Sequence, residues 1–152
     1  MLVRDYERND RDACRALFDQ LVDMHRRLYP RAEIGSTFSL DGRIFVAEDE
    51  GRVVGYAGLL WHDRLAELEP IVVAPKHRRR GVGRALAARV AQAAREAGAV
   101  RIFVRPAARN REAIAFFRSV GFDVLGYVQL QVDFEPRERR LGEHIAGCDF
   151  RV

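Results

Sequence analysis

A turn rich in glycine and arginine follows an apolar run in the stretch Ile71-Val72-Val73-Ala74-Pro75-Lys76-His77-Arg78-Arg79-Arg80-Gly81-Val82-Gly83-Arg84. The apolar run is typical of a strand, and small and apolar residues recur at helical spacing from Val82 onward. Gly81 and Gly83 leave room for main-chain amides to approach a ligand, and the unpaired N–H groups of a helix's first turn attract anions. The stretch therefore predicts a strand, a turn and a helix start that together bind a pyrophosphate.

The cations of the chain are concentrated around this turn. Residues 75–118 hold twelve Lys and Arg against Glu96 and Glu112, a local charge of +10 in a chain of net charge +4, which leaves −6 elsewhere. A nucleic-acid binder usually spreads its cations over a broad face with interleaved aromatic residues, whereas here the densest cations run into the two glycines. The pattern favours a compact phosphate ligand over nucleic acid, and a solvated basic surface is the simpler alternative.

The length and composition predict one domain. A chain of 152 residues with 48% hydrophobic and 32% charged residues can bury its own core over residues 1–152. No apolar run is long enough to span a bilayer and the first residues lack a secretion signal, so a cytoplasmic location and no membrane partner are expected. Cys14 and Cys148 fit neither a disulfide framework nor the spacing of metal ligands, so no metal is expected.

Periodicity along the chain predicts strands alternating with helices. Strands are expected near residues 2–6, 43–48, 52–61, 65–73, 100–104, 125–134 and 144–152, and helices near residues 10–28, 82–97 and 110–120. Residues 30–42 are expected to form a loop with some helical character. Pro70 has no amide hydrogen, so we expect a bulge or bend within the fourth strand.

Two better-known nucleotide loops do not fit the turn, because no Gly-Lys-Ser/Thr is present and Leu86 stands where the dinucleotide fingerprint requires glycine. The pattern Arg78-x-x-Gly81-x-Gly83, after a strand that ends Val-Val-Ala-Pro, resembles instead the acetyl-coenzyme A signature of the GNAT family of N-acetyltransferases. Downstream, the pattern Asn110-x-x-Ala113-x-x-Phe116-Phe117-x-x-x-Gly121-Phe122 resembles the family's second motif. The resemblance covers about residues 43–134.

This resemblance implies a fold class and a cofactor site. The fold is an α/β (α+β) GNAT domain, with a mixed, mostly antiparallel sheet of six to seven strands, a splay between the fourth and fifth strands, and about four helices. Acetyl-CoA is the implied cosubstrate. The implied contacts are the amides of Ile71, Val72 and Val73 on the pantetheine arm and the thioester carbonyl, Arg78, Arg79, Arg80, Gly81, Val82, Gly83 and Arg84 around the pyrophosphate, Asn110 on the cofactor arm, and Phe117 at the thiol end. From the residues alone, Asn110 is a helix cap and Phe116 a core side chain.

Glu67 and Glu69 are the candidate general bases, because an alkylammonium acceptor must lose a proton before it attacks a thioester. They lie two residues apart on one face of the predicted strand and lead towards the thioester. Glu67 is the first choice, because its distance from Arg78 matches the strand glutamate that acts as base in some members of the family. Glu69 is two residues nearer the acyl group. The alternative is that both glutamates only face solvent or bind the positive charge of the substrate.

The second motif departs from the family's commonest pattern at Phe117. Many members carry a tyrosine there, whose hydroxyl is thought to protonate the departing thiolate, and phenylalanine cannot do so. Water, Tyr127 or Tyr56 are the alternatives for this proton. Another base position, used by some protein N-terminal acetyltransferases, corresponds to Arg105, which disfavours that subgroup.

Together these features predict an acyltransferase that moves an acetyl group directly from acetyl-CoA to a primary amine of a small molecule, peptide or protein. A non-catalytic module that binds or senses acyl-CoA is the alternative that the missing tyrosine favours, and a basic domain that binds nucleic acid is a third. The acid excess outside residues 75–118 favours a cationic acceptor. A homodimer, formed by pairing or swapping of a terminal strand at residues 144–152, is a further prediction.

Overall fold

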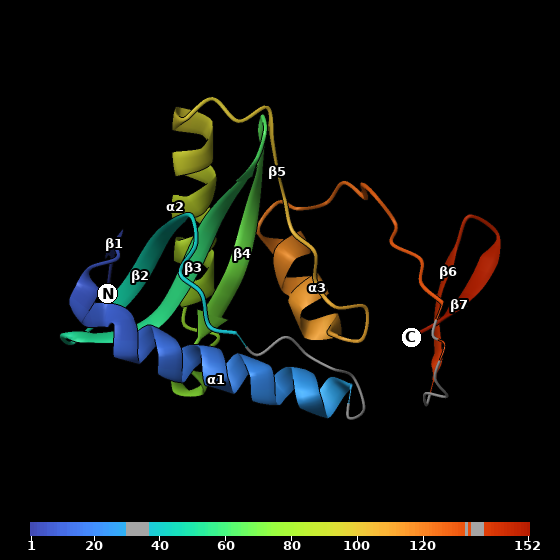
Figure 1. Cartoon of the computed structure of the whole chain (residues 1–152), viewed down its shortest axis with the longest axis horizontal. Helices are drawn as coiled ribbons and strands as arrows, with labels where there is room; N and C mark the ends of the chain where they lie inside the picture. Colours follow the sequence, from blue (N-terminus) through green and yellow to red (C-terminus); the bar gives the residue numbers. More distant parts are fainter. Residues whose placement is uncertain (30–36, 133, 135–138) are drawn as a thin grey trace.

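Five strands form the central sheet of the computed structural model, which describes residues 1–29, 37–132, 134 and 139–152. In spatial order they are β1 (Leu2–Asp5), β2 (Arg43–Asp49), β3 (Arg52–His62), β4 (Leu65–Val73) and β5 (Arg101–Phe103). Neighbouring strands are antiparallel except β4 and β5, which run parallel (Figure 1). The predicted class, a mixed and mostly antiparallel sheet with helices, is therefore confirmed.

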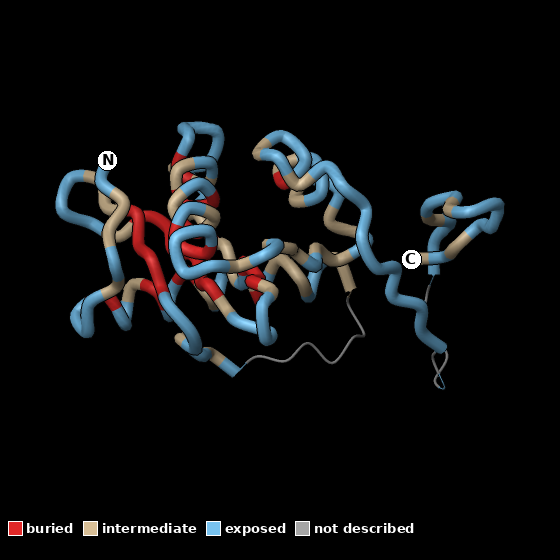
Figure 2. Tube along the Cα trace, turned by 90° about the horizontal axis from the view of Figure 1, so that it is seen from above, coloured by how far each residue is buried: buried red, intermediate tan, exposed pale blue. Residues whose placement is uncertain are grey.

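Two helices cover opposite faces of this sheet. They are α1 (Arg11–Leu28) and α2 (Val82–Glu96), and a third helix, α3 (Arg111–Ser119), follows β5. Alternate residues of β2 face the two helices. Phe45 packs in a core cluster with Leu86 and Val90 of α2, called the cluster of α2. Val46 packs in a second core cluster with Cys14 and Leu17 of α1, called the cluster of α1. The alternation arises because successive side chains of a strand point to opposite faces of its sheet. Figure 2 shows that the buried residues concentrate in the sheet and α2.

The sheet opens between β4 and β5. The two strands pair only over Leu65–Glu67 and Arg101–Phe103, whereas β4 continues to Val73 with β3 as its one described partner. The predicted splay between the fourth and fifth strands is thus confirmed. Beyond Glu67, the edge of β4 that faces away from β3 is left without a strand neighbour in the described part of the chain.

An irregularity on the other edge of β4 confirms the break predicted at Pro70. The pairing of β3 with β4 shifts register between Ala57 and Leu59, so that Glu69 and Pro70 have no paired residue. Gly58 lies opposite this shift, and a Cβ atom there would lie 2.2 Å from the carbonyl oxygen of Glu69. Only a glycine lets the two backbones approach so closely.

The C-terminal part differs from expectation. Residues 125–132 and 134 form no strand and expose most of their apolar side chains, and the predicted strand at 144–152 is a hairpin of β6 (Leu141–Ile145) and β7 (Cys148–Arg151). The described sheet therefore has five strands rather than six or seven, with three α-helices rather than about four. The alternation of apolar and polar residues over 125–134 is typical of a strand, but a strand forms only where another strand pairs with it. Gly147, with φ +80°, reverses the chain at Ala146-Gly147.

Three further expectations concern residues 30–42, the two cysteines and membrane spans. Most of residues 30–42, expected as a loop with some helical character, lie outside the described residues, and residues 37–42 form a loop without helix. Both Cys14 and Cys148 are free thiols. None of the described helices is long and apolar enough to cross a membrane.

Candidate active site

The glycine turn at the start of α2 has the backbone that the sequence predicts. A short 3-10 turn, Pro75–His77, precedes it, and Arg78 donates a hydrogen bond from Nε to the Val73 carbonyl over 3.1 Å. Gly81 has φ +85°, and a Cβ atom there would meet nothing within 4 Å. The Ala85 amide donates to the Gly81 carbonyl, so the amides of residues 82–84 lie ahead of this first helical hydrogen bond. They are free for an anion.

Side chains of the turn separate into exposed cations and buried supports. Arg79 and Arg80 are exposed and Arg78 and Arg84 lie on or near the surface, whereas Val82 is buried in the core, so that only its main chain is offered to a ligand. A Cβ atom on Gly83 would lie 3.1 Å from the Phe116 ring and 3.7 Å from the Val73 side chain. The end of β4, the start of α2 and the middle of α3 therefore meet at Gly83.

The three residues predicted to contact the thioester line the open part of the sheet. Val72 is buried against the cluster of α1, while Ile71 and Val73 pack partly against the cluster of α2. These side chains fix the strand from both faces. All three residues lie beyond the last β4–β5 pair. Because the Ala74 amide donates to the Val54 carbonyl of β3, the amides of Ile71 and Val73 point to the unpaired edge, whereas that of Val72 points to β3, contrary to the expectation for Val72.

The second motif holds a helix cap and an aromatic cluster. Oδ1 of Asn110 accepts a hydrogen bond from the Ala113 amide over 3.0 Å, which confirms the cap. Phe117 is 7% exposed, and its ring lies 5.3 Å from that of Phe116 and 5.7 Å from that of Phe122. Phe116 packs partly buried against the core, as expected. The contact of Asn110 and Phe117 with a cofactor stays a prediction.

The two candidate tyrosines lie in contrasting places. Tyr56 is fully buried in the cluster of α1, where burial raises the pKa of its hydroxyl, and that hydroxyl has no hydrogen-bond partner among the described residues. Tyr127 is 97% exposed on the segment after α3. A buried hydroxyl of raised pKa is a poor proton donor, and water is the simplest source of the proton for a thiolate.

The two candidate carboxylates lie side by side but in different environments. Glu67 is fully buried, and its Oε1 and Oε2 accept hydrogen bonds from Nε and Nη2 of Arg105 over 2.7 and 2.9 Å. Nε2 of His62 lies 2.6 Å from Oε2 of Glu67. The side chain of Glu69 is 54% exposed, and its carboxylate lies 3.7 Å from Nη2 of Arg105.

These environments shift the two acids in opposite directions. Burial alone would raise the pKa of Glu67, but hydrogen bonds with Arg105, Glu69 and His62 outweigh burial and hold that pKa below its usual range. Burial raises the pKa of Glu69, and the neighbouring Glu67 carboxylate raises it further. A carboxylate that accepts protons more readily and reaches solvent is the better general base.

The sequence indicates both glutamates but not what surrounds them. Its pattern marks His62 as no more than a surface or packing residue, and Arg105 stands out only for its place in the family pattern. Arg105 reaches Glu67 because β4 and β5 pair in parallel, with Glu67 opposite Phe103, whereas His62 reaches it from the end of β3, which pairs antiparallel with β4. The one signal in the sequence is that His62 ends one strand and Arg105 follows another.

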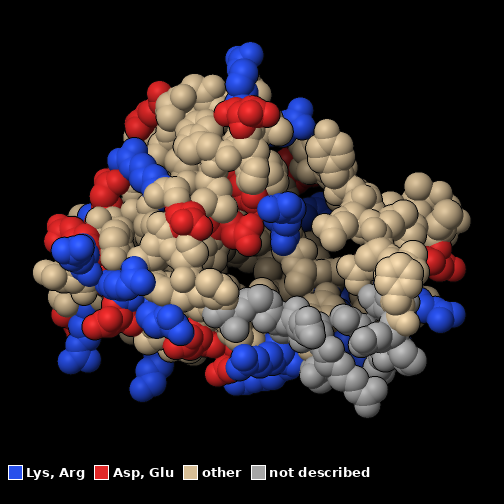
Figure 3. All heavy atoms as spheres, viewed as in Figure 1, with Lys and Arg blue, Asp and Glu red and all other residues tan. Residues whose placement is uncertain are grey.

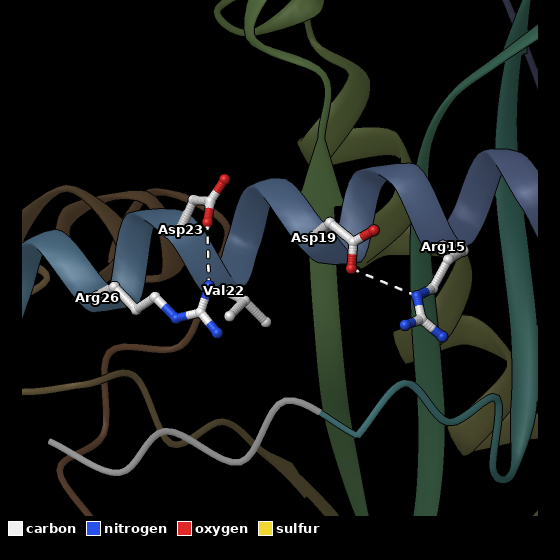
Figure 4. A pocket seen from close by; sticks show the side chains of 5 residues that line it. All are labelled: Arg15, Asp19, Val22, Asp23 and Arg26. Atoms are coloured by element: carbon white, nitrogen blue, oxygen red, sulfur yellow. Dashed lines mark hydrogen bonds and ion pairs between the residues drawn. The ribbon is translucent and has the colours of Figure 1, made fainter.

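Charged residues on α1 pair with one another. Figure 4 shows a shallow pocket along the helix, with ion pairs from Arg15 to Asp19 at 3.4 Å and from Arg26 to Asp23 at 3.5 Å. Figure 3 shows acidic and basic side chains intermixed over this face. Such exposed, mutually neutralised pairs are typical of a solvated helix surface and supply no reactive group.

Comparison with known proteins places this geometry in a family. The profile of the Acetyltransferase (GNAT) family matches residues 10–122, which is most of the chain. The protein therefore belongs to the GNAT acetyltransferase family, and the resemblance seen in the two motifs is confirmed.

Similar sequences include named and uncharacterised acetyltransferases. The streptothricin acetyltransferase of Streptomyces lavendulae is 39% identical over 90 residues, which cover 57% of this chain and 47% of that protein. An uncharacterised N-acetyltransferase of Mycobacterium tuberculosis is 32% identical over 102 residues, which cover 66% of this chain and 60% of that protein. The chain thus spans about half to three fifths of these relatives.

Similar solved structures support the fold. The ribosomal-protein-alanine N-acetyltransferase from Brucella melitensis has a TM-score of 0.61 at 28% identity, covering 80% of this chain and 83% of that chain. An aminoglycoside N-acetyltransferase in complex with CoA has a TM-score of 0.66 at 22% identity, covering 87% of this chain and 98% of that chain.

Proposed function

We propose that the protein is an N-acetyltransferase that transfers the acetyl group of acetyl-CoA directly to a primary amine. The observation that carries the proposal is the meeting of two features, the unpaired edge of β4 beyond Glu67 and the exposed glycine turn that begins α2. The first offers main-chain groups to an extended arm, and the second offers amides and cations to a pyrophosphate. Membership of the GNAT family and the CoA complex of a structural neighbour support the same cosubstrate.

The described residues fit this cosubstrate. Gly81 has open space above it, and the exposed cations beside it complement a pyrophosphate, while Val82 and Gly83 contribute main-chain amides. Ile71 and Val73 present their main-chain amides at the unpaired edge, whereas the amide of Val72 points to β3. When bound there, acetyl-CoA supplies an acetyl group activated as a thioester.

Glu69 is the residue that we assign as general base. Its carboxyl is half-exposed, its pKa is raised, and it lies two residues nearer to Ile71 than Glu67 does. It accepts the proton of the acceptor ammonium, which leaves the nitrogen lone pair free to attack the acetyl carbonyl. The amide of Val73, which points to the unpaired edge of β4, donates to the oxygen on which negative charge develops. No covalent intermediate with the protein is needed.

The acceptor is a primary amine of a small molecule, a peptide or a protein. The relatives named above act on streptothricin, an aminoglycoside and a ribosomal protein, according to their names, and these three classes form a rational first panel. Release of CoA thiol with each amine tests the proposal. Binding of CoA without turnover of any amine would favour the alternative, a sensing module, which Phe117 in place of tyrosine supports.

Gly81 offers a direct test of the pyrophosphate site. Gly81→Ala is expected to raise the Kd for CoA about tenfold, because a methyl group at this turn obstructs the anion and shifts the amides that bind it. Gly98→Ala is a matched control, since Gly98 has φ +87° and no heavy atom within 4 Å of an added Cβ atom, but lies at the opposite end of α2. Isothermal titration calorimetry with CoA compares them. Equal affinity of the two variants would contradict the assigned site.

A second copy of the chain is the partner that we propose for the exposed segment after α3. Val124, Leu125, Tyr127, Leu130, Val132 and Phe134 are exposed large hydrophobic residues on this segment. The segment has strand-like alternation but no strand neighbour among the described residues, and β5 is one of the two edge strands of the described sheet, next to β4 over three residues only. An unpaired apolar segment and an open sheet edge on the same chain are complementary between two copies.

This proposal predicts a dimer that depends on the segment. Analytical ultracentrifugation of the wild type should give a dimer at micromolar concentration, and Leu130→Asp with Val132→Asp should give a monomer, because charge cannot be buried at the shared interface. Leu2→Asp, which changes an exposed leucine on β1, should remain a dimer. A monomeric wild type would overturn the proposal.

A further inference from the structure

Three hydrogen bonds engage both oxygens of the carboxylate of Glu67, whose side chain is fully buried. Arg105 donates two of them with a fork geometry, and the third joins Oε2 to Nε2 of His62. An incoming ammonium would have to displace one of these partners before it reached an oxygen. The geometry therefore makes Glu67 a poor proton acceptor, although it is the glutamate that the spacing of the sequence favours.

One aromatic ring lies beneath both partners of Glu67. The Phe103 ring lies 5.6 Å from the His62 ring, and the Arg105 guanidinium lies 5.8 Å from the centre of the same ring. Phe103 is paired in register with Glu67 across β4 and β5. The cluster is therefore built by three strands, since His62 ends β3, Glu67 lies in β4, and Arg105 follows β5.

We propose that Glu67 is a positioning residue: Arg105 and His62 hold it as a fixed anion beside Glu69, and Glu69 takes the proton from the acceptor amine. This inference deepens the proposed acetyltransferase function and rests on it for its kinetic readout. In this assignment Glu67 is a buried, permanently charged group and Glu69 is the half-exposed general base. Arg105, between them, contacts both carboxylates.

Three described groups of charged or titratable character act on Glu69. Glu67, on the same strand, raises its pKa, whereas Arg105, after β5, and His62, at the end of β3, lower it. The anion and the two opposing groups therefore set how readily Glu69 accepts a proton. Removal of Glu67 and removal of Arg105 should change this property in opposite directions.

The first measurement is the pH profile of kcat/KM for one amine that the wild type acetylates. Glu67→Gln removes the neighbouring anion and leaves Arg105 to Glu69, so the acid limb should move down by about half a pH unit or more. Arg105→Gln removes the neighbouring cation, so the same limb should move up by a similar amount. Because the amine is the same throughout, its own titration does not contribute to the difference.

The second measurement does not require turnover. In protein labelled with 13C at the glutamate carboxyl carbons, the resonance missing from Glu69→Gln identifies Glu69. Its titration midpoint should fall in Glu67→Gln and rise in Arg105→Gln. If the wild type binds no CoA and acetylates no amine but these midpoints move as expected, the proposed function fails while the electrostatic coupling holds.

Matched controls lie at the exposed end of the β2–β3 hairpin, Glu50 in its turn and Arg52 at the start of β3. Glu50→Gln and Arg52→Gln change the net charge by the same amounts and should leave both the limb and the midpoint of Glu69 in place. If Glu67→Gln does not fold, Arg105→Gln decides alone, because the Arg105 side chain is 62% exposed. Loss of activity in Glu67→Gln at every pH, with CoA still bound, would make Glu67 itself the base. If the titration midpoint of Glu69 does not move in Glu67→Gln or in Arg105→Gln, the cluster of Glu67, Arg105 and His62 has only a structural role.

Discussion

Glu69→Gln is expected to lower kcat/KM for amine acetylation about 10²- to 10⁴-fold, the range typical of losing a general base. Glutamine has nearly the same shape but cannot accept a proton from the acceptor ammonium. The Kd for CoA should stay within about twofold of the wild type, because Glu69 lies on β4 and outside the turn around Gly81. Thiol release gives the rate, and calorimetry gives the affinity.

Glu50→Gln is the matched control for this substitution. It makes the same chemical change at an exposed position of the hairpin turn between β2 and β3, and the rate should not change. A Glu69→Gln variant with a kcat/KM within about threefold of the wild type would contradict the assignment of the base. The limb of the pH profile that belongs to Glu69 should be absent from the residual activity, because the titrating carboxyl is gone, while the titration of the acceptor amine remains.

The pH dependence of the wild type follows from the same carboxyl. A general base acts in its deprotonated form, so kcat/KM should rise as the pH passes upward through the pKa of Glu69. Because burial and the Glu67 carboxylate raise that pKa, the rise should lie at a higher pH than an ordinary glutamate would give.

The backbone of the glycine turn and the cap of α3 could be predicted from the sequence because their signals are local. Gly81 provides a backbone with positive φ, and Gly83 provides room for a neighbouring ring. Asn110 caps α3 by accepting a hydrogen bond from the amide of Ala113, the third residue of that helix. Each of these requirements depends on residues nearby in the chain or on a single residue type. Spacing alone was therefore sufficient to locate them.

The different environments of Glu67 and Glu69 could not be predicted in the same way. Glu67 and Glu69 occupy equivalent positions in the alternating pattern of β4, so the pattern cannot distinguish them. Both carboxylates lie near Arg105. Their burial differs because Arg105, which is 38 residues from Glu67 in the sequence, forms an ion pair with only the first of them at close range. That contact depends on the register of β5 against β4, which no local pattern encodes.

The segment at 125–134 shows the converse limit. Val128, Leu130 and Val132 alternate as a strand requires, yet they form none in the described structure. A strand is stabilised by hydrogen bonds and side chains of its neighbour, so the pattern gives a capacity for pairing and not the partner.

Gly58→Ala is expected to lower the free energy of unfolding by about 1–3 kcal/mol, the usual cost of overpacking a tight site, and to lower turnover as well. The added methyl group would lie 2.2 Å from the carbonyl oxygen of Glu69 and 3.1 Å from its carbonyl carbon. Both atoms belong to the main chain, so no side-chain rotation can relieve the contact. The backbone of β4 must move, and this backbone carries the proposed base.

Chemical denaturation and thiol release measure the two effects on the same protein. Gly126→Ala is the control, because no heavy atom lies within 4 Å of a Cβ atom there and its φ is not in the left-handed region. It should change neither stability nor rate by much. A Gly58→Ala variant that is less stable but fully active would show that the irregularity serves the sheet alone. A variant with unchanged stability would contradict the close approach of β3 to β4, because the Glu69 carbonyl could not then lie where the methyl group must go.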